Sequence, residues 1–192
     1  MDDEVRLAAE QRARVLIDQQ LTGAGWAVVD RKDLNLFTPR GSAVREAIMK
    51  PGHGRADYLL YVDKQVVGVI EAKAQGTPLS GVEWQSAMYA TGLPEVARQR
   101  PVLVAGRLPF VFEANGSETH FTSGHDPHPR ARRFFGFPQP RTLARWIREA
   151  SSRGTRLRRR TTTSTEAAEP HGGKNSHMHR GHSQDSGGGT SG

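Results

Sequence analysis

Three charged residues in two neighbouring apolar segments are the side chains of this sequence best suited to chemistry. Asp57 lies near the start of the segment 56–62, and Glu71 and Lys73 end the segment 66–73. Both segments are apolar at odd and even positions alike, which is typical of strands covered on both faces of a sheet. Charged side chains do not belong in such strands by default, so these three require an explanation.

A hairpin between the two segments would bring the acids together. If residues 63–65 form a three-residue loop, Val62 pairs with Val66 and Asp57 lies directly opposite Glu71. Residues opposite one another on one face of a sheet have Cβ atoms about 4.5–5.5 Å apart. Two carboxylates at that separation repel each other unless a cation lies between them.

The chemistry that fits this arrangement is metal-assisted hydrolysis. A divalent cation that prefers oxygen ligands, such as Mg²⁺, would bind Asp57 and Glu71, and the carbonyl of Ala72 could supply another ligand. Lys73 points to the same face as Glu71 because side chains in a strand alternate. Its amine could hold or deprotonate a water that attacks a phosphodiester.

A purely structural role also fits the same residues. Glu71 and Lys73 can form a same-face ion pair at the end of an edge strand, and Asp57 can accept hydrogen bonds from backbone groups of the loop 52–54. The spacing by itself leaves both interpretations open.

The elements that must position these residues predict one mixed α/β domain over residues 1–150. The pattern predicts helices at 3–22, from about 80 to Ala90 and at 142–150, and strands at 26–29, 43–49, 56–62, 66–73, 101–104 and 110–113. Asn115-Gly116 indicates a further hairpin. We expect a central mixed sheet flanked by helices.

Residues 151–192 predict a low-complexity, disordered tail. Apolar side chains are too few there to offset the entropy of ordering the backbone, about 1–2 kcal/mol per residue. Its arginine run at 156–160 is most simply a solvated charge run, and its four histidines lack neighbours that would support a metal site. These residues also hold most of the net charge of +7, so the basic composition says little about the folded part.

The composition excludes several classes of protein. With no cysteine, the chain has no disulfide, zinc ribbon or thiol nucleophile. No apolar stretch approaches the roughly 18 residues of a membrane span, and the first residues do not resemble a secretory signal. We expect a cytoplasmic protein.

Two stretches resemble a known nuclease motif. Residues 54–62 and 68–73 are similar to the PD-(D/E)xK motif as it occurs in the N-terminal nuclease domain of type I restriction enzyme R subunits. Gln85 and Tyr89 match the QxxxY motif that follows it in many relatives, and Glu10 resembles an acid on the first helix. The segments 108–116 and 126–137 also resemble the family, so the similarity spans about residues 5–150.

The resemblance implies a restriction-endonuclease-like fold and Mg²⁺-dependent cleavage of double-stranded DNA, in assembly with specificity and methylation subunits. It implies metal binding by Asp57, Glu71, Ala72 and Glu10, management of the nucleophile by Lys73, and DNA binding or positioning by Gln85, Tyr89 and Arg55.

The sequence also departs from the family. Relatives continue into an ATP-driven translocase, but no G-x-x-x-x-G-K-[ST] phosphate loop occurs here, so we expect no ATP site and a product truncated before the motor. Lys64 and Gln65 stand where relatives usually have glycine in the hairpin turn. The alternative function is a non-catalytic DNA- or subunit-binding remnant that contacts phosphates through basic residues such as Arg55, Arg130, Arg132 and Arg133.

Overall fold

The computed structural model describes residues 2–33, 40–51, 53, 55–79, 92–93 and 101–165, with side chains described as far as residue 152. The chain divides into two units, Met1–Arg153 and Gly154–Gly192. The first unit holds the sheet and the helical segments that pack on it. Its elements, in chain order, are α1 (Asp2–Gly23), β1 (Ala27–Asp30), the 3-10 helix η1 (Arg31–Asp33), β2 (Gly41–Ile48), β3 (Arg55–Val62), β4 (Gln65–Ala72), β5 (Phe110–Ala114), β6 (Thr119–Ser123), β7 (Arg132–Phe134) and the start of α4 (Pro140–Thr165).

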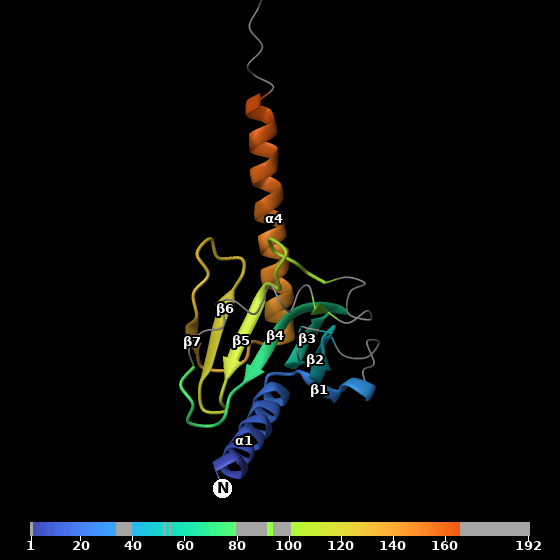
Figure 1. Ribbon diagram of the computed structural model, residues 1–192. Coiled ribbons are helices and arrows are strands. Elements are labelled where there is room, and N and C mark those ends of the chain that lie inside the picture. Colours follow the sequence, from blue (N-terminus) through green and yellow to red (C-terminus); the bar gives the residue numbers. More distant parts are fainter. Residues whose placement is uncertain are drawn as a thin grey trace, which may run out of the picture. The chain divides into compact units, whose positions relative to one another are not determined.

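The strands form one mixed sheet in which spatial order follows chain order, from β1 at one edge to β7 at the other (Figure 1). Two neighbouring pairs, β1–β2 and β4–β5, are parallel, and the other four pairs are antiparallel. This confirms the predicted α/β fold with a mixed central sheet.

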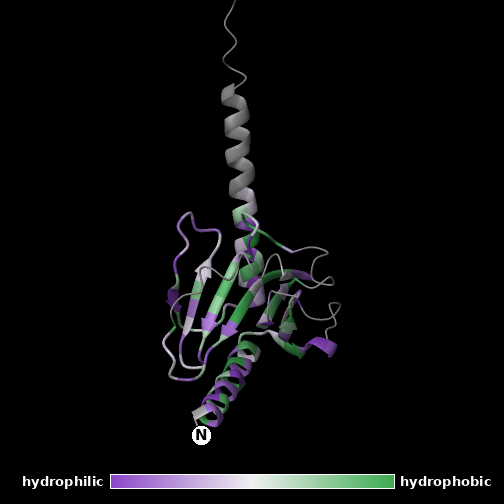
Figure 2. Ribbon diagram, viewed as in Figure 1, coloured by the Kyte–Doolittle hydropathy of each residue, from purple (hydrophilic) through white to green (hydrophobic). Residues whose placement is uncertain are grey.

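Apolar side chains cover both faces of the sheet, as the unbroken apolar character of its central strands predicted. On the first face, Tyr58, Leu60 and Ile70 pack with α1 and with the first turns of α4. On the second face, Leu59 and Val69 belong to a separate cluster. Figure 2 shows this concentration of hydrophobic residues in the middle strands.

Helix α1 follows the predicted segment closely, but its buried stripe is narrower than its apolar positions suggested. Ala13, Ile17 and Leu21 are fully buried, whereas Val5 is 64% exposed. The buried stripe therefore lies in the C-terminal half of α1, which fixes that half against the sheet.

The β3–β4 hairpin differs from prediction at its turn. Its turn has two residues, Asp63 and Lys64, both with positive φ as in a type I′ turn, so Val62 pairs with Gln65 rather than with Val66. An irregularity between Leu60 and Tyr61 then shifts the register. The predicted three-residue loop is therefore wrong.

The β5–β6 hairpin confirms the turn predicted at Asn115-Gly116. The Asn115 side-chain oxygen accepts hydrogen bonds from the backbone N–H groups of Ser117 and Glu118, at 3.0 and 2.8 Å. Gly116 has φ +83°, and a Cβ there would lie 3.0 Å from the side chain of Leu16. Both the backbone conformation and the packing against α1 thus require glycine.

Other elements differ from prediction or lie beyond the description. Residues 101–104 form no strand: Val104 makes only an isolated bridge to Arg107. The short strand β7 was not predicted, and α4 continues past Ala150 to Thr165. Arginines in that continuation are good helix formers, which favours the longer helix. The helix predicted from about 80 to Ala90 and the sequence after Thr165 lie outside the described residues. Among the helices that are described, none is long and apolar enough to cross a membrane.

Candidate active site

The carboxylate of Asp57 is held at the start of β3 by two donors. Arg14 of α1 donates from Nη2 to Oδ1 at 2.7 Å, and the backbone N–H of Ala72 donates to Oδ2 at 2.9 Å. The Asp57 side chain is 18% exposed. It is thus a partly buried charge with a fixed orientation at the end of β4, and its described bonds lead to α1 and β4. Gly52 and Gly54 of the loop predicted as an alternative partner lie outside the described residues.

The inner register of the hairpin brings the start of β3 next to the end of β4. Leu60 pairs with Gly68, Leu59 with Val69 and Tyr58 with Ile70, where the ladder ends. Continued by one residue, this register would place Asp57 opposite Glu71. The register shift inside the hairpin compensates for the shorter turn, so the inner pairs have the register that a three-residue loop predicts.

Glu71 and Lys73 end strand β4. Glu71 is 8% exposed, and in the alternation of the strand it follows Val69 onto the second face of the sheet. Lys73 is half-buried, and its backbone N–H donates to the carbonyl of Ala114 at 2.8 Å. Both residues are therefore positioned by the parallel pairing of β4 with β5.

The Ala72 carbonyl is also directed toward Asp57. In a strand the N–H and C=O of one residue point to the same side, and the Ala72 N–H points to the Asp57 carboxylate. The Ala72 carbonyl, which was predicted to supply a metal ligand, thus points to the same side of β4 as this N–H, away from the Lys73 N–H that bonds to β5.

Two further acids lie on the strands that flank β3 and β4. Glu46 lies between the pairs Arg45–Tyr58 and Ala47–Ala56, which places it opposite Asp57. On the other side, Glu71 pairs in register with Glu113, which is only 3% exposed. Glu46 and Glu113 were not predicted as site residues, because the strands that pair with β2 and β4 could not be identified from the sequence.

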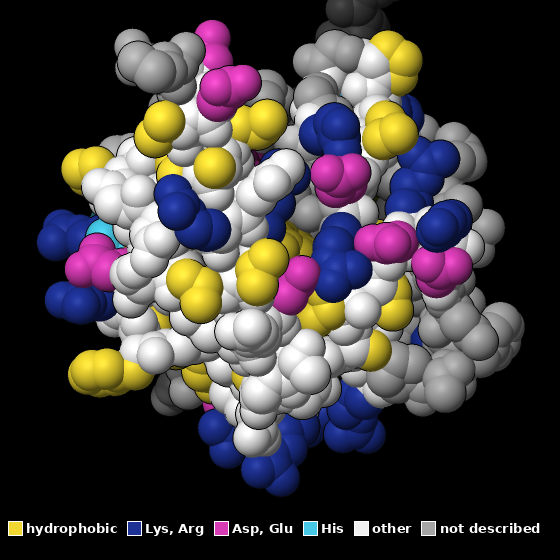
Figure 3. All heavy atoms as spheres, turned by 90° about the horizontal axis from the view of Figure 1, so that it is seen from below, with side chains coloured by type: hydrophobic (Ala, Val, Ile, Leu, Met, Phe, Trp, Pro, Cys, Tyr) yellow, Lys and Arg dark blue, Asp and Glu magenta, His cyan; other side chains and the backbone are white. Residues whose placement is uncertain are grey.

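Ion pairs link Asp57 to Arg14, Arg14 to Glu46, and Glu46 to Arg55. Arg14 Nη1 lies 3.4 Å from Glu46 Oε1, and Arg55 Nη2 lies 2.6 Å from Glu46 Oε2. Glu46 has φ +50°, a backbone conformation that non-glycine residues rarely adopt. Figure 3 views the molecule from the end where α1 lies in Figure 1 and shows basic and acidic side chains interleaved on this surface.

Glu10 lies near this site. It is one helical turn before Arg14, so both share a face of α1. The backbone N–H of Gln75 donates to the carbonyl of Ala9 at 3.4 Å, so the segment that follows Lys73 passes alongside the same turn. Gln85 and Tyr89 lie outside the described residues.

The oxygen ligands available at this site suit Mg²⁺ better than a metal whose ligands all come from the protein. Within the described part of the chain, no three His, Cys, Asp or Glu side chains converge as a metal cage. Mg²⁺ is commonly held by one or two carboxylates, with water and phosphate oxygens filling its remaining positions. Asp57, Glu71 and the Ala72 carbonyl offer that number of oxygens, and each Asp57 oxygen keeps a second lone pair beside its present donor.

A second ion-pair network holds α1 against the sheet next to the site. Asp18 accepts from the hydroxyl of Tyr58 at 2.9 Å and from Nη2 of Arg45 at 2.9 Å. Burial, followed by the charge of Asp18 and this hydrogen bond, raises the pKa of Tyr58, and the hydrogen bond to Asp18 raises the pKa of Arg45. These groups stay in one charge state at neutral pH, so the network positions α1 and does not exchange protons.

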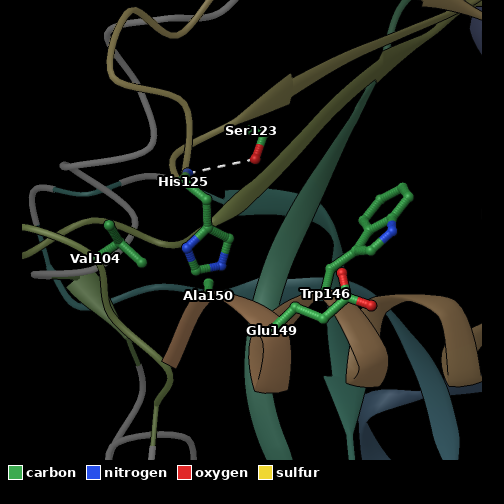
Figure 4. A pocket seen from close by; sticks show the side chains of 6 residues that line it. All are labelled: Val104, Ser123, His125, Trp146, Glu149 and Ala150. Atoms are coloured by element: carbon green, nitrogen blue, oxygen red, sulfur yellow. Dashed lines mark hydrogen bonds between the residues drawn. The ribbon is translucent and has the colours of Figure 1, made fainter. Parts of the chain in front are cut away.

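A hollow of about 410 Å³ lies elsewhere, between the start of α4 and the end of β6 (Figure 4). Its lining includes His125, Ser123, Trp146 and Glu149. The Ser123 hydroxyl accepts from the backbone N–H of His125 at 3.3 Å, so the described bond between the two residues does not involve the imidazole ring. The ring nitrogen Nε2 of His125 is buried with no partner among the described residues, and burial lowers the pKa of this histidine.

Comparison with known protein families supports the endonuclease resemblance. Residues 37–124 match the model of the type I restriction enzyme EcoKI endonuclease subunit, second domain. The match covers β2 to β6 and so includes Asp57, Glu71 and Lys73, while Glu10 and Arg14 precede it. No curated protein and no solved structure gives a significant match.

Proposed function

We propose that this restriction-endonuclease-like domain hydrolyses DNA phosphodiester bonds in a Mg²⁺-dependent reaction centred on Asp57, Glu71 and Lys73. The observation that carries the proposal is the convergence of Asp57 on the end of β4, through its bond to the Ala72 N–H. The match to an endonuclease subunit over the same strands supports the assignment.

In this mechanism Asp57, Glu71 and the Ala72 carbonyl hold the ion, and Glu10 steadies it from α1. When bound, Mg²⁺ supplies positive charge that stabilises the negative charge developing on the phosphate oxygens. Lys73, as the neutral amine, would hold the attacking water and take up its proton as the water oxygen bonds to phosphorus. The P–O bond of the leaving group breaks in the same step, and the leaving oxygen takes a proton from solvent water. Burial of Glu71 beside Val69 limits competing water around the reacting groups.

Substrate positioning falls to residues around the three catalytic side chains. Arg55 is exposed at the start of β3 and can reach a phosphate, and Gln85 and Tyr89 complete the set by their motif. The proposal places the reaction in the cytoplasm, with double-stranded DNA as substrate and with specificity and methylation subunits as partners that choose the site.

A plasmid-nicking assay tests the reaction. The wild type should nick supercoiled plasmid with Mg²⁺ and not with EDTA. Asp57→Asn and Lys73→Ala should each lower the nicking rate by about 10²-fold or more, the range for loss of a metal ligand or a general base. The matched control is Asp126→Asn, because Asp126 is also a partly exposed acid paired with an arginine, at 3.1 Å.

The control variant should nick at the wild-type rate. Nicking that persists in both Asp57→Asn and Lys73→Ala, or that is unaffected by EDTA, contradicts the proposed active site. Salt-sensitive DNA binding without any metal-dependent nicking would instead identify the domain as a DNA-binding remnant.

A further inference from the structure

A groove of about 590 Å³ lies beside the candidate active site, between η1, the C-terminal end of β2 and the N-terminal end of β3. Four of its lining residues are basic and two are acidic. The lining residues are Asp30, Arg31, Lys32, Arg45, Glu46, Ile48 and Arg55. We refer to this hollow as the basic groove.

The cations of the basic groove are not equally neutralised. Arg45 is bound by Asp18 and by Asp30, with Nη1 3.0 Å from the latter, so its charge is compensated. Arg31 and Lys32 lie exposed on η1, and among the described residues no carboxylate lies within ion-pair distance of either. Two adjacent cations without counter-charges attract an anion that can contact both.

The basic groove is continuous with the site through Glu46. This residue lines the groove, and its two carboxylate oxygens hold Arg55 on one side and Arg14 on the other. Arg14 in turn contacts Asp57 at 2.7 Å. A line of basic groups therefore runs from Arg31 on η1 to the carboxylate of the proposed catalytic centre.

The two arginines bound to Glu46 can exchange this carboxylate for another anionic partner. Arg55 and Arg14 are 58% and 41% exposed, and Glu46 is 55% exposed. Ion pairs with this exposure contribute little to stability, typically up to about 1 kcal/mol. A phosphate diester offers a guanidinium the same bidentate geometry as a carboxylate, so it can replace Glu46 as the partner.

We propose that the basic groove binds the phosphates of one DNA strand and leads that strand to the active site. Arg31 and Lys32 contact phosphates at the outer end, and Arg55 and Arg14 transfer from Glu46 to phosphates next to Asp57. This inference rests on the proposed nuclease function, to which it adds the path of the substrate.

Binding measured without cleavage tests the path. Fluorescence anisotropy with a labelled DNA duplex of about two helical turns is recorded in EDTA between roughly 50 and 200 mM salt. The double variant Arg31→Ala/Lys32→Ala should bind about tenfold more weakly, and its log–log salt slope should fall by about 2, one for each lost phosphate contact.

A matched control removes two cations of α4 that do not line the groove. Arg145 and Arg148 are exposed, and Arg145→Ala/Arg148→Ala should change affinity less than about twofold. Equal losses in both double variants would show that only overall charge matters. That result, or unchanged binding of Arg31→Ala/Lys32→Ala, would overturn the groove proposal, as would a wild type that does not bind.

The exchange at Glu46 has its own test. Glu46→Gln keeps the shape of the side chain but removes the charge that competes with phosphate, so DNA binding should tighten severalfold. Weaker binding by this variant would contradict the transfer of Arg14 and Arg55.

The two proposals fail in different assays. If Asp57→Asn still nicks plasmid but Arg31→Ala/Lys32→Ala loses binding, the catalytic assignment is wrong and the groove stands. If Asp57→Asn is inactive and the groove variant binds as the wild type does, only the groove assignment is wrong.

Discussion

The candidate active site and the His125 hollow are two polar regions of the sheet domain, and they are built in opposite ways. At the first, Asp57 lies among opposite charges and backbone donors that come from α1, β2 and β4. At the second, a cavity of about 410 Å³ surrounds one buried ring nitrogen that has no partner among the described residues.

The difference shows that concavity and chemistry are separate properties of this molecule. A reaction centre needs several charged groups that act on the same atoms. In the proposed active site these groups are Asp57, Glu71 and Lys73. The hollow has volume and a polar atom, but the described hydrogen bond of its serine hydroxyl is to a backbone N–H. We therefore expect substitutions in the two regions to affect different measurements.

The largest contrast is expected from replacing one titratable side chain in each region. Glu71→Gln should lower Mg²⁺-dependent nicking by about 10²-fold or more, because a metal ligand loses its charge. His125→Gln should leave the rate within about twofold of wild type. Comparable losses of nicking in both variants, measured at equal folded fraction by circular dichroism, would contradict the separation.

A smaller effect is expected from the ion pair that joins α1 to Asp57. Arg14→Ala should reduce nicking about tenfold, mainly by raising KM, because a charged contact to phosphate is lost. Unfolding free energy should fall by less than about 1 kcal/mol, since Arg14 is 41% exposed.

Arg6→Ala provides the control on the same helix. Arg6 pairs only with Asp3, at 3.9 Å and largely exposed, so its removal should change neither rate nor stability. A wild-type KM for Arg14→Ala would show that this arginine only anchors the helix.

The hollow should respond in stability rather than in activity. His125→Phe removes a buried nitrogen that has no described partner and retains an aromatic ring for the edge contact with Phe110. We expect the variant to gain about 1 kcal/mol in urea unfolding, the order of the cost of an unsatisfied buried polar group. His128→Phe, at an exposed position nearby, should give no gain, and equal gains in the two variants would count against the argument.

The smallest effect is a pH dependence specific to the hollow. Burial lowers the pKa of His125 below its ordinary 6.5. Above pH 6.5 the ring is neutral in both folded and unfolded chains; as pH falls through 6.5 the unfolded chain binds a proton that the folded chain does not, so stability decreases until the folded pKa is reached.

This decrease should be reduced in His125→Phe relative to wild type. Urea midpoints measured from pH 7.5 down to pH 5 test it, and identical pH profiles for the two proteins would show that His125 does not cause the loss.

The strands that carry the site could be predicted from the sequence because their apolar pattern is unbroken and their length is ordinary. The exact pairing could not. Asp63-Lys64 lacks the glycine that usually marks a two-residue turn, so a three-residue loop was expected. The irregularity at Leu60 restored the inner register from Leu60–Gly68 to Tyr58–Ile70, although the predicted turn was wrong.

Other parts of the site depend on contacts that a single sequence does not contain. Arg14 and Asp57 are 43 positions apart, and Glu113 meets Glu71 only because β5 pairs with β4. The stretch 101–104 has strand-like composition, yet only the Val102 N–H joins β4, by a bond to the carbonyl of Val66. Propensity alone could not distinguish this single bond from a ladder.

The sequential strand order has a consequence for how the chain folds. The turn that joins β3 to β4 has two residues, whereas residues 73–109 separate β4 from β5. The entropic cost of bringing two strands together rises with the length of the segment between them. We therefore expect the β3–β4 hairpin, which carries Asp57 and Glu71, to form before β5 pairs with β4. The Ala72 N–H that binds Asp57 belongs to this hairpin, so that part of the site does not depend on the later strands.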